Sequence, residues 1–111
     1  MKNESCNKQN LSEFTKGWLV GDFEPSIFKN KDCEVGIKEY KAGTVERLHV
    51  HNIVTEYTIV LNGTVIMLEK EFNKGDIVKI DPGVANQFES ITDSMLLVIK
   101  TPSIPSDKVE L

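Results

Sequence analysis

The chain has little of what marks a nucleic-acid-binding protein. Its 111 residues include a single arginine, Arg47, and 13 basic residues stand against 17 acidic ones, with no basic block. Proteins that bind DNA or RNA carry clustered Lys and Arg. The composition therefore argues against a nucleic-acid partner.

Long apolar runs are also absent. No stretch approaches the roughly 20 apolar residues that span a bilayer, and the first ten residues, MKNESCNKQN, lack the apolar segment of a signal peptide. Cys6 and Cys33 are far apart and match no CxxC pattern, so we interpret them as free thiols in a reducing compartment. These absences predict a cytoplasmic protein without a membrane partner.

Helical periodicity is missing as well, and short β-rich runs separated by Gly, Pro, Asn and Asp take its place. We expect strands at about 18–21, 26–29, 33–41, 44–51, 55–61, 64–72, 76–80, 86–91 and 94–100. Many short strands at this spacing indicate an all-β sandwich or barrel. Residues 1–16 show little periodicity, so we divide the chain into an N-terminal arm, 1–16, and a β domain, 17–111.

Histidine is scarce, yet both histidines occur in one tripeptide, His49-Val50-His51, with Glu56 five residues further on. Side chains two residues apart on a strand point to the same face, and the next strand can bring Glu56 to them. Two imidazoles and a carboxylate form the three-ligand site of non-haem iron and catalytic zinc. The pattern predicts a divalent metal held by His49, His51 and Glu56, with iron, zinc, manganese and nickel all compatible. The alternative is a pair of strand histidines without a ligand.

The same alternation places Arg47 on the face of His49. A guanidinium there suits a substrate carboxylate or phosphate; a rim salt bridge or simple solvent exposure is the alternative. The segment Met95–Ile99 is apolar on both faces and must be covered on both. This favours a homodimer, although the chain's own N-terminal strands offer another cover.

Glycines bracket the histidines at regular spacings. The spacings of the pattern G(X)5HXH(X)3-4E(X)6G are matched by Gly43, His49, His51, Glu56 and Gly63. In this first motif the chain resembles the cupin superfamily, small jelly-roll β-barrels. A second cupin motif, G(X)5PXG(X)2H(X)3N, is matched only at Gly75 and Gly83. Asp81 replaces its first proline, and Asn86 replaces its histidine.

The resemblance implies an all-β cupin jelly-roll barrel over residues 17–111. It also implies that Asn86 occupies the position of the usual fourth metal ligand. A carboxamide is a weaker donor than imidazole, so Asn86 either leaves coordination positions open for substrate or marks the loss of the metal site. We place Asn86, Arg47 and Phe88, which has the parity of Asn86, in the substrate-binding set.

Three functions remain open at this point. The first is a metal-dependent enzyme acting on a small anionic or sugar-like molecule. The second is a non-catalytic module that binds or senses a small molecule, and the third is a metal-free isomerase or epimerase. In the third, His49 or His51 would be the general acid or base and Glu56 its orienting partner. The sequence assigns no catalytic residue, substrate or reaction.

Overall fold

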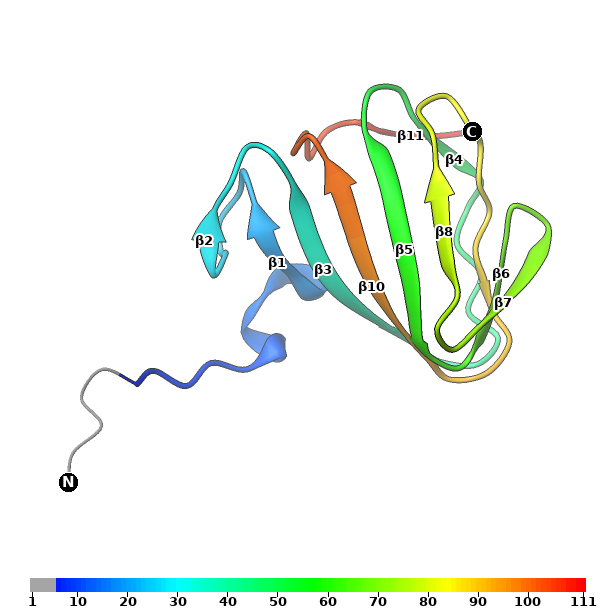
Figure 1. The fold of residues 1–111 in the computed structure, drawn as a ribbon, viewed down its shortest axis with the longest axis horizontal. Coiled ribbons are helices and arrows are strands. Elements are labelled where there is room, and N and C mark those ends of the chain that lie inside the picture. Colours follow the sequence, from blue (N-terminus) through cyan, green and yellow to red (C-terminus); the bar gives the residue numbers. More distant parts are fainter. Residues whose placement is uncertain (1–5) are drawn as a thin grey trace.

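The computed structural model describes residues 6–111, which form three β-sheets. The strands are β1 (Trp18–Gly21), β2 (Phe28–Lys29), β3 (Glu34–Tyr40), β4 (His49–His51), β5 (Thr55–Asn62), β6 (Thr64–Met67), β7 (Lys70–Asn73), β8 (Ile77–Ile80), β9 (Glu89–Ser90), β10 (Ser94–Thr101) and β11 (Lys108–Glu110). A six-stranded sheet has the order β2-β1-β3-β10-β5-β8, and smaller sheets have the orders β7-β6-β9 and β11-β4. In Figure 1, β6 and β7 lie to the right of β8, and β11 runs near the upper ends of β5 and β8. The described strands do not close into a continuous hydrogen-bonded barrel.

Most expected strands form, but three are shortened or divided. The run 86–91 is a strand only at Glu89–Ser90. The run 64–72 is divided into β6 and β7 by Leu68 and Glu69, whose φ angles of 51° and 62° are left-handed. The run 44–51 is a strand only at His49–His51. The regular alternation of side chains between the two faces of a strand therefore does not hold for the residues before His49. The position predicted for Arg47 depended on that alternation.

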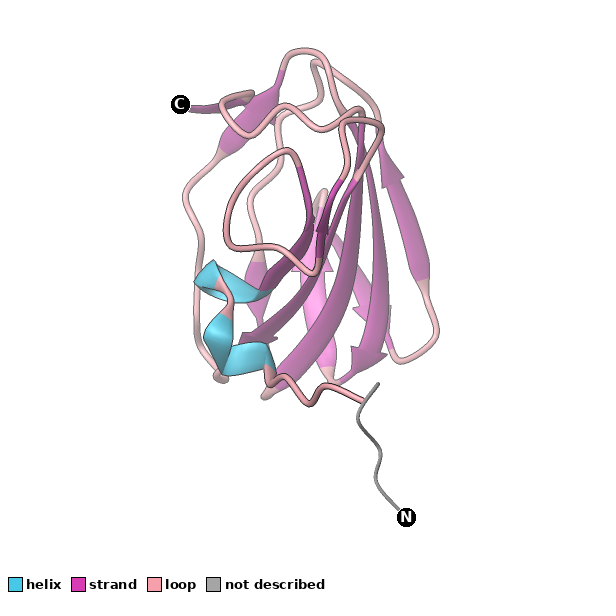
Figure 2. Ribbon diagram, turned by 90° about the vertical axis from the view of Figure 1, so that its left-hand side faces the viewer, coloured by secondary structure: helices cyan, strands magenta, loops and turns pink. Residues whose placement is uncertain are grey.

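The N-terminal arm is described only in part, because residues 1–5 lie outside the described range. Leu11–Glu13 and Thr15–Gly17 form two short 3-10 turns, η1 and η2, beside the strands (Figure 2), and Phe14 between them is buried. No helix in residues 6–111 is long and apolar enough to cross a membrane. Cys6 and Cys33 form no disulfide, as expected.

The inward face of the large sheet changes from apolar to polar along its strands. The buried apolar cluster consists of Val60, Val65, Met67, Val78, Ile80, Phe88, Leu96 and Val98. In register across β10 and β5, Leu96 lies opposite Val60, whereas Lys100 lies opposite Glu56. One end of the interior is therefore a dry core, and the other end holds buried polar groups.

The motif glycines adopt a backbone conformation that side chains oppose. Their φ angles are 87°, 88°, 90° and 83° at Gly43, Gly63, Gly75 and Gly83. At Gly63 an added Cβ would also lie 2.4 Å from the Asp93 carbonyl oxygen, whereas at Gly75 it would meet nothing within 4 Å. Gly63 is thus required for both conformation and space.

We expect Gly63→Ala to destabilise the protein more than Gly75→Ala. A left-handed φ alone costs about 1–2 kcal/mol for an L-residue, and the clash at Gly63 involves main-chain atoms that cannot rotate away. Urea unfolding of the two variants measures the difference. Equal losses would mean that the β5–β6 turn shifts to admit a methyl group.

Candidate functional site

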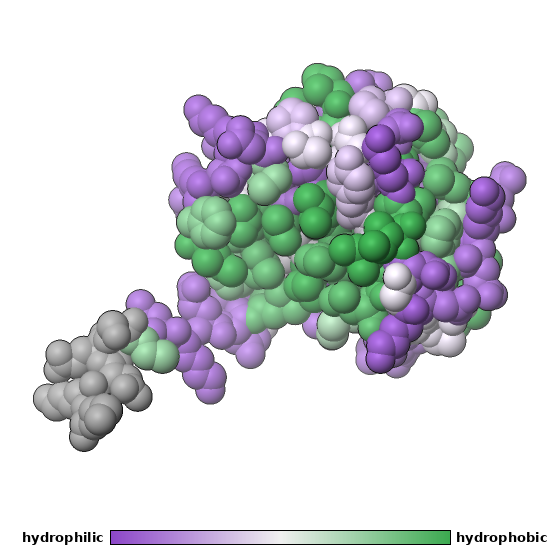
Figure 3. Space-filling model, in the orientation of Figure 1, coloured by the Kyte–Doolittle hydropathy of each residue, from purple (hydrophilic) through white to green (hydrophobic). Residues whose placement is uncertain are grey.

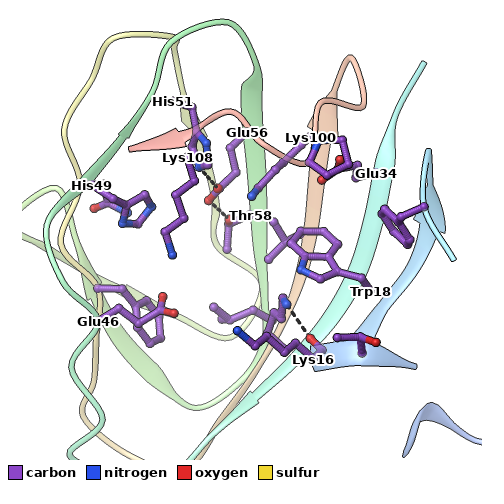
Figure 4. A pocket seen from close by; sticks show the side chains of 18 of the residues that line it. Lys16, Trp18, Glu34, Glu46, His49, His51, Glu56, Thr58, Lys100 and Lys108 are labelled. Carbon is purple, nitrogen blue, oxygen red and sulfur yellow. Dashed lines mark hydrogen bonds and ion pairs between the residues drawn. The ribbon is translucent and has the colours of Figure 1, made fainter. Parts of the chain in front are cut away.

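A cavity of about 470 Å³ opens at the polar end of the interior (Figure 4). It is lined by side chains from the large sheet, from β4 and β6, and from the segment that leads into β11. The three expected metal ligands, His49, His51 and Glu56, all line it and are all buried. A volume of this size suits a small organic molecule.

Backbone carbonyls orient both histidine rings. Nδ1 of His49 lies 3.0 Å from the Arg47 carbonyl oxygen, and Nδ1 of His51 lies 3.2 Å from that of Asp107. A carbonyl oxygen only accepts hydrogen bonds, so each Nδ1 carries the proton that it donates. The neutral ring then keeps its lone pair on Nε2, the arrangement found in metal-binding and general-base histidines.

His51 faces Glu56 across the cavity wall. Nε2 of His51 lies 3.6 Å from Oε1 of Glu56, which is too long for a hydrogen bond, and this buried Nε2 has no other partner in the described chain. The Thr58 hydroxyl donates to the other carboxylate oxygen at 2.8 Å. Burial alone raises the pKa of Glu56, but His51, Thr58 and the charge of Lys100 outweigh it and hold that pKa below its ordinary value.

This pairing creates an electrostatic requirement. Glu56 is ionised at neutral pH, so its oxygen and the Nε2 lone pair of a neutral His51 would repel each other. A proton or a metal cation between them removes the repulsion. Two donors about 2.1 Å from one ion are separated by about 3.0–3.4 Å at octahedral or tetrahedral angles, close to the spacing of this pair.

The third donor is less well placed for a metal. The rings of His49 and His51 are 5.3 Å apart between centroids and meet edge to face. As the side chains lie, no three His, Cys, Asp or Glu residues within 6–111 form a group that could hold a metal ion. The structure gathers the three expected ligands in one cavity and pairs two of them; ligation by all three stays a prediction.

Asn86 is buried on the cavity wall, where its oxygen has a structural partner. Oδ1 accepts a hydrogen bond of 3.0 Å from the Leu68 N–H, in the turn between β6 and β7. The Asn86 backbone also exchanges two hydrogen bonds with His49, of 2.8 and 3.0 Å. Asn86 therefore fixes the turn and the His49 strand, and its NH2 group is the part left to contact a ligand.

Phe88 and Tyr40 form an apolar wall of the cavity. Their ring centroids are 4.4 Å apart, and only 3% of Phe88 is exposed. Phe88 also belongs to the main apolar cluster. It lines the cavity, as expected, while packing in the core.

Arg47 lies outside the cavity, contrary to our expectation. Its side chain is 74% exposed and pairs with Glu110 at 3.3 Å. The expectation assumed a regular strand over 44–51, but the chain is irregular before His49, so Glu46 lines the cavity in place of Arg47. The rim salt bridge, which was the alternative, is what forms.

Asp107 is a functional residue that no sequence pattern indicated. Its carboxylate accepts hydrogen bonds from the backbone N–H groups of Asn52, Ile53 and Val54 at 3.2, 2.8 and 2.9 Å. Its carbonyl orients His51, and the next residue, Lys108, starts β11 opposite His51. A segment that follows two prolines thus positions the histidine strand.

Lysines are the second group that sequence reasoning missed. The cavity is lined by Lys16, Lys38, Lys100 and Lys108. A signal was present for one of them, since Lys100 has the parity of Leu96 and Val98, which face inward. A lysine on the buried face of a central strand is unusual and marks a cavity.

No protein-family model matches the chain, and no curated protein matches it. Solved structures do match. The DMSP lyase DddQ from Ruegeria pomeroyi has a TM-score of 0.70 at 18% identity, over 84% of this chain and 49% of that one. This chain thus spans about half the length of that lyase.

Two further structures agree with this chain over more of their own length. A Klebsiella pneumoniae protein with a double-stranded β-helix domain has a TM-score of 0.70 at 14% identity, over 99% of this chain and 96% of that one. An RmlC-like cupin from Shewanella frigidimarina has a TM-score of 0.64 at 18% identity, over 68% and 71%. The fold thus agrees with the first cupin motif of the sequence, and the chain has the cupin fold.

Proposed function

We propose that the chain is a metal-dependent enzyme acting on a small anionic or sugar-like molecule held in the cavity. The observation that carries the proposal is the buried Nε2 of His51, which faces a carboxylate oxygen of Glu56 at 3.6 Å without a hydrogen bond. A divalent cation would satisfy both groups. His49, which lines the same cavity, is the third donor.

The residues around this pair would serve such an enzyme. A divalent metal bound there would supply Lewis acidity toward a substrate oxygen. The carbonyls of Arg47 and Asp107 hold the two rings, and Thr58 holds the carboxylate of Glu56. The apolar wall at Phe88 excludes water from one side of the ligand, which strengthens electrostatic interactions inside the cavity.

A metal-free enzyme is the second candidate, and the absence of a closed three-ligand group within residues 6–111 favours it. A proton between Nε2 and Oε1 would make His51 an imidazolium paired with Glu56. His51 would then act as general acid or base, with Glu56 as its orienting partner. Such a pair suits isomerisation, epimerisation or elimination. A non-catalytic binding module would use the same cavity without turnover.

Metal content separates these candidates. We expect gently purified protein, or protein reloaded with Fe, Zn, Mn or Ni, to hold about one metal ion per chain. His51→Ala and Glu56→Gln should lose it, because each removes a strong donor. Asn86→Ala is the matched control, since its oxygen is occupied by Leu68, and should keep the metal despite lower stability.

Elemental analysis after dialysis measures the bound metal. Wild-type protein that takes up no metal under any loading condition would exclude the metal-dependent enzyme and leave the proton-bearing pair. If Asn86→Ala empties the site as fully as His51→Ala does, the carboxamide is itself a ligand.

We also propose that the chain forms a homodimer through the outer face of the large sheet. Four apolar side chains lie in register across β3, β10, β5 and β8: Ile37, Leu97, Ile59 and Ile77. Figure 3 shows apolar residues gathered on this face, and Ile77 is 64% exposed. Contiguous apolar surface of this kind marks an interaction site. Because the row carries no charge that would select a different partner, a second copy packed sheet on sheet fits it best.

A further inference from the structure

The cavity contains lysines without a carboxylate partner within residues 6–111, although the Lys38 ammonium donates a hydrogen bond to the Lys16 carbonyl. None of its four lysines, Lys16, Lys38, Lys100 and Lys108, forms an ion pair with a carboxylate in the described part of the chain. Lys38 and Lys100 are half-buried inside, while Lys16 and Lys108 are exposed at the mouth. Figure 4 shows the Lys100 side chain reaching toward Glu56 and the Lys108 side chain extending past His51 into the cavity.

Four glutamates also line the cavity, but none forms an ion pair with a cavity lysine within residues 6–111. Glu24 pairs with Lys29 at 3.8 Å, outside the cavity. Glu34 accepts a hydrogen bond of 2.9 Å from Ser103, and Glu56 accepts one from Thr58. Burial, and then the charge of Glu46, raises the pKa of Tyr40, so Glu46 acts on that hydroxyl. The formal charges of the four lysines and four glutamates balance, yet the lysines have no carboxylate partner in the described chain.

Lys100 shows the difference between proximity and pairing. Lys100 is on β10, between β3 and β5. It lies directly opposite Glu34 on β3 and directly opposite Glu56 on β5. Neither carboxylate comes within salt-bridge distance of its ammonium. Both carboxylates instead accept hydrogen bonds from hydroxyl groups.

An indole ring holds the two inner ammonium groups. Nζ of Lys38 lies 4.0 Å from the centre of the Trp18 ring, and Nζ of Lys100 lies 4.8 Å from it. Gly36 makes room for the ring, since a Cβ there would be 2.7 Å from the indole. Cation–π contacts orient the lysines but contribute only about 0.5–2 kcal/mol each and leave the charges unneutralised.

Gathering these cations has an electrostatic cost. Burial, and then the neighbouring charge of Lys100, lowers the pKa of Lys38 to about 8. Burial also lowers the pKa of Lys100. An anion bound between the two lysines would reduce their repulsion, so this charge arrangement favours anion binding.

We propose that Lys38 and Lys100, held by Trp18 and assisted by Lys108 at the mouth, bind the anionic group of a small organic molecule, a carboxylate or a phosphate. The inference narrows the proposed function from an anionic or sugar-like ligand to an anionic one. It rests on that function only in placing the rest of the ligand beside His51 and Glu56. The anion site itself needs no metal.

Trp18 provides the measurement, because it is the only tryptophan of the chain and touches both lysines. Its fluorescence is followed while malonate, inorganic phosphate or malonamide is added at constant ionic strength. The protein is used as purified and again after chelation of metals. We expect a saturable change with an anion in both samples and none with malonamide, the neutral analogue of malonate. A larger affinity for malonate or for phosphate identifies which anion the site takes.

Lysine variants connect the signal to the site. Lys38→Met and Lys100→Met keep the apolar stem and should each weaken anion binding about tenfold or more. Lys79→Met is the matched control, because Lys79 pairs with Asp81 on the opposite face of the sheet, and should leave the affinity unchanged. Thermal unfolding checks that each variant is folded and reports ligand stabilisation independently.

The affinity of the wild-type protein should also fall as pH rises through about 8, where Lys38 loses its proton. The charged groups acting on Lys38 are Lys100, Glu46, Lys16 and Lys108. Of these, the charge of Glu46 raises the pKa of Lys38 and the three lysines lower it.

The inference is overturned if neither anion produces a saturable change, or if Lys79→Met weakens binding as much as Lys100→Met. His51→Ala separates it from the proposed function. If His51→Ala loses the metal but still binds the anion, both the metal site and the anion site are supported. If the wild-type protein binds metal but no anion, only the anion site is ruled out.

Discussion

Asp107→Ala is expected to lower the free energy of unfolding by about 2–3 kcal/mol and to release the His51 ring. The carboxylate accepts hydrogen bonds from three backbone N–H groups in the loop between β4 and β5. Val54, one of the three donors, is only 2% exposed, so its N–H group would have no water to replace the carboxylate. An unsatisfied buried donor costs about 1–3 kcal/mol, and the two more exposed donors add less.

Asp81→Ala is the matched control for this experiment. Asp81 is an exposed aspartate whose contact is a surface pair with Lys79 at 3.4 Å, so its removal should cost no more than about 1 kcal/mol. Urea unfolding gives the stability of both variants. With only two histidines in the chain, NMR signals of the imidazole rings report directly on His51. Equal stability of the two variants, with an unchanged His51 signal, would contradict the role assigned to Asp107.

Ile77→Glu is expected to convert the proposed dimer into a monomer. A carboxylate at the end of the apolar row would be buried against the partner's sheet, and an unpaired buried charge costs several kcal/mol, which weakens association by about a hundredfold or more. Because Ile77 is 64% exposed in the single chain, the substitution should not disturb folding.

Ile53→Glu serves as control, since Ile53 is similarly exposed, at 57%, but lies in the loop after β4. Light scattering coupled to size exclusion should give twice the 12.5 kDa chain mass for the wild type and for this control. The Ile77→Glu protein should give the chain mass itself. A wild-type protein that stays monomeric at high micromolar concentration would end the dimer proposal.

Local sequence patterns predicted the parts of the molecule that depend on local geometry. His49 and His51 share a cavity because they are two residues apart on a strand, and Glu56 joins them from the next strand. The motif glycines were recognisable because turns with positive φ require them. The cupin fold followed from these same residues.

Errors arose where the outcome depended on long-range pairing or on a break in regularity. Glu46 lines the cavity where Arg47 was predicted, because the backbone is irregular before His49. Asp107 reaches the loop at Asn52 across 55 residues of sequence, and nothing near either residue indicates the contact. Lys100 carried a usable signal in its inward parity, whereas the role of Lys38 depends on a long-range contact with Trp18, which Lys100 also contacts.

The return of the chain from β10 to β11 gives segment length a direct influence on ligand choice. Residues 102–107 connect Thr101 to a strand in which Lys108 must pair opposite His51. Deleting one residue from this connection would shift β11 by one position and place Val109 opposite His51, turned toward the cavity in place of Lys108. The mouth would then lose a charge and gain an apolar side chain, with no substitution at any histidine, glutamate or lysine. The length of this connection therefore sets the charge at the cavity mouth, even when His49 and His51 are unchanged.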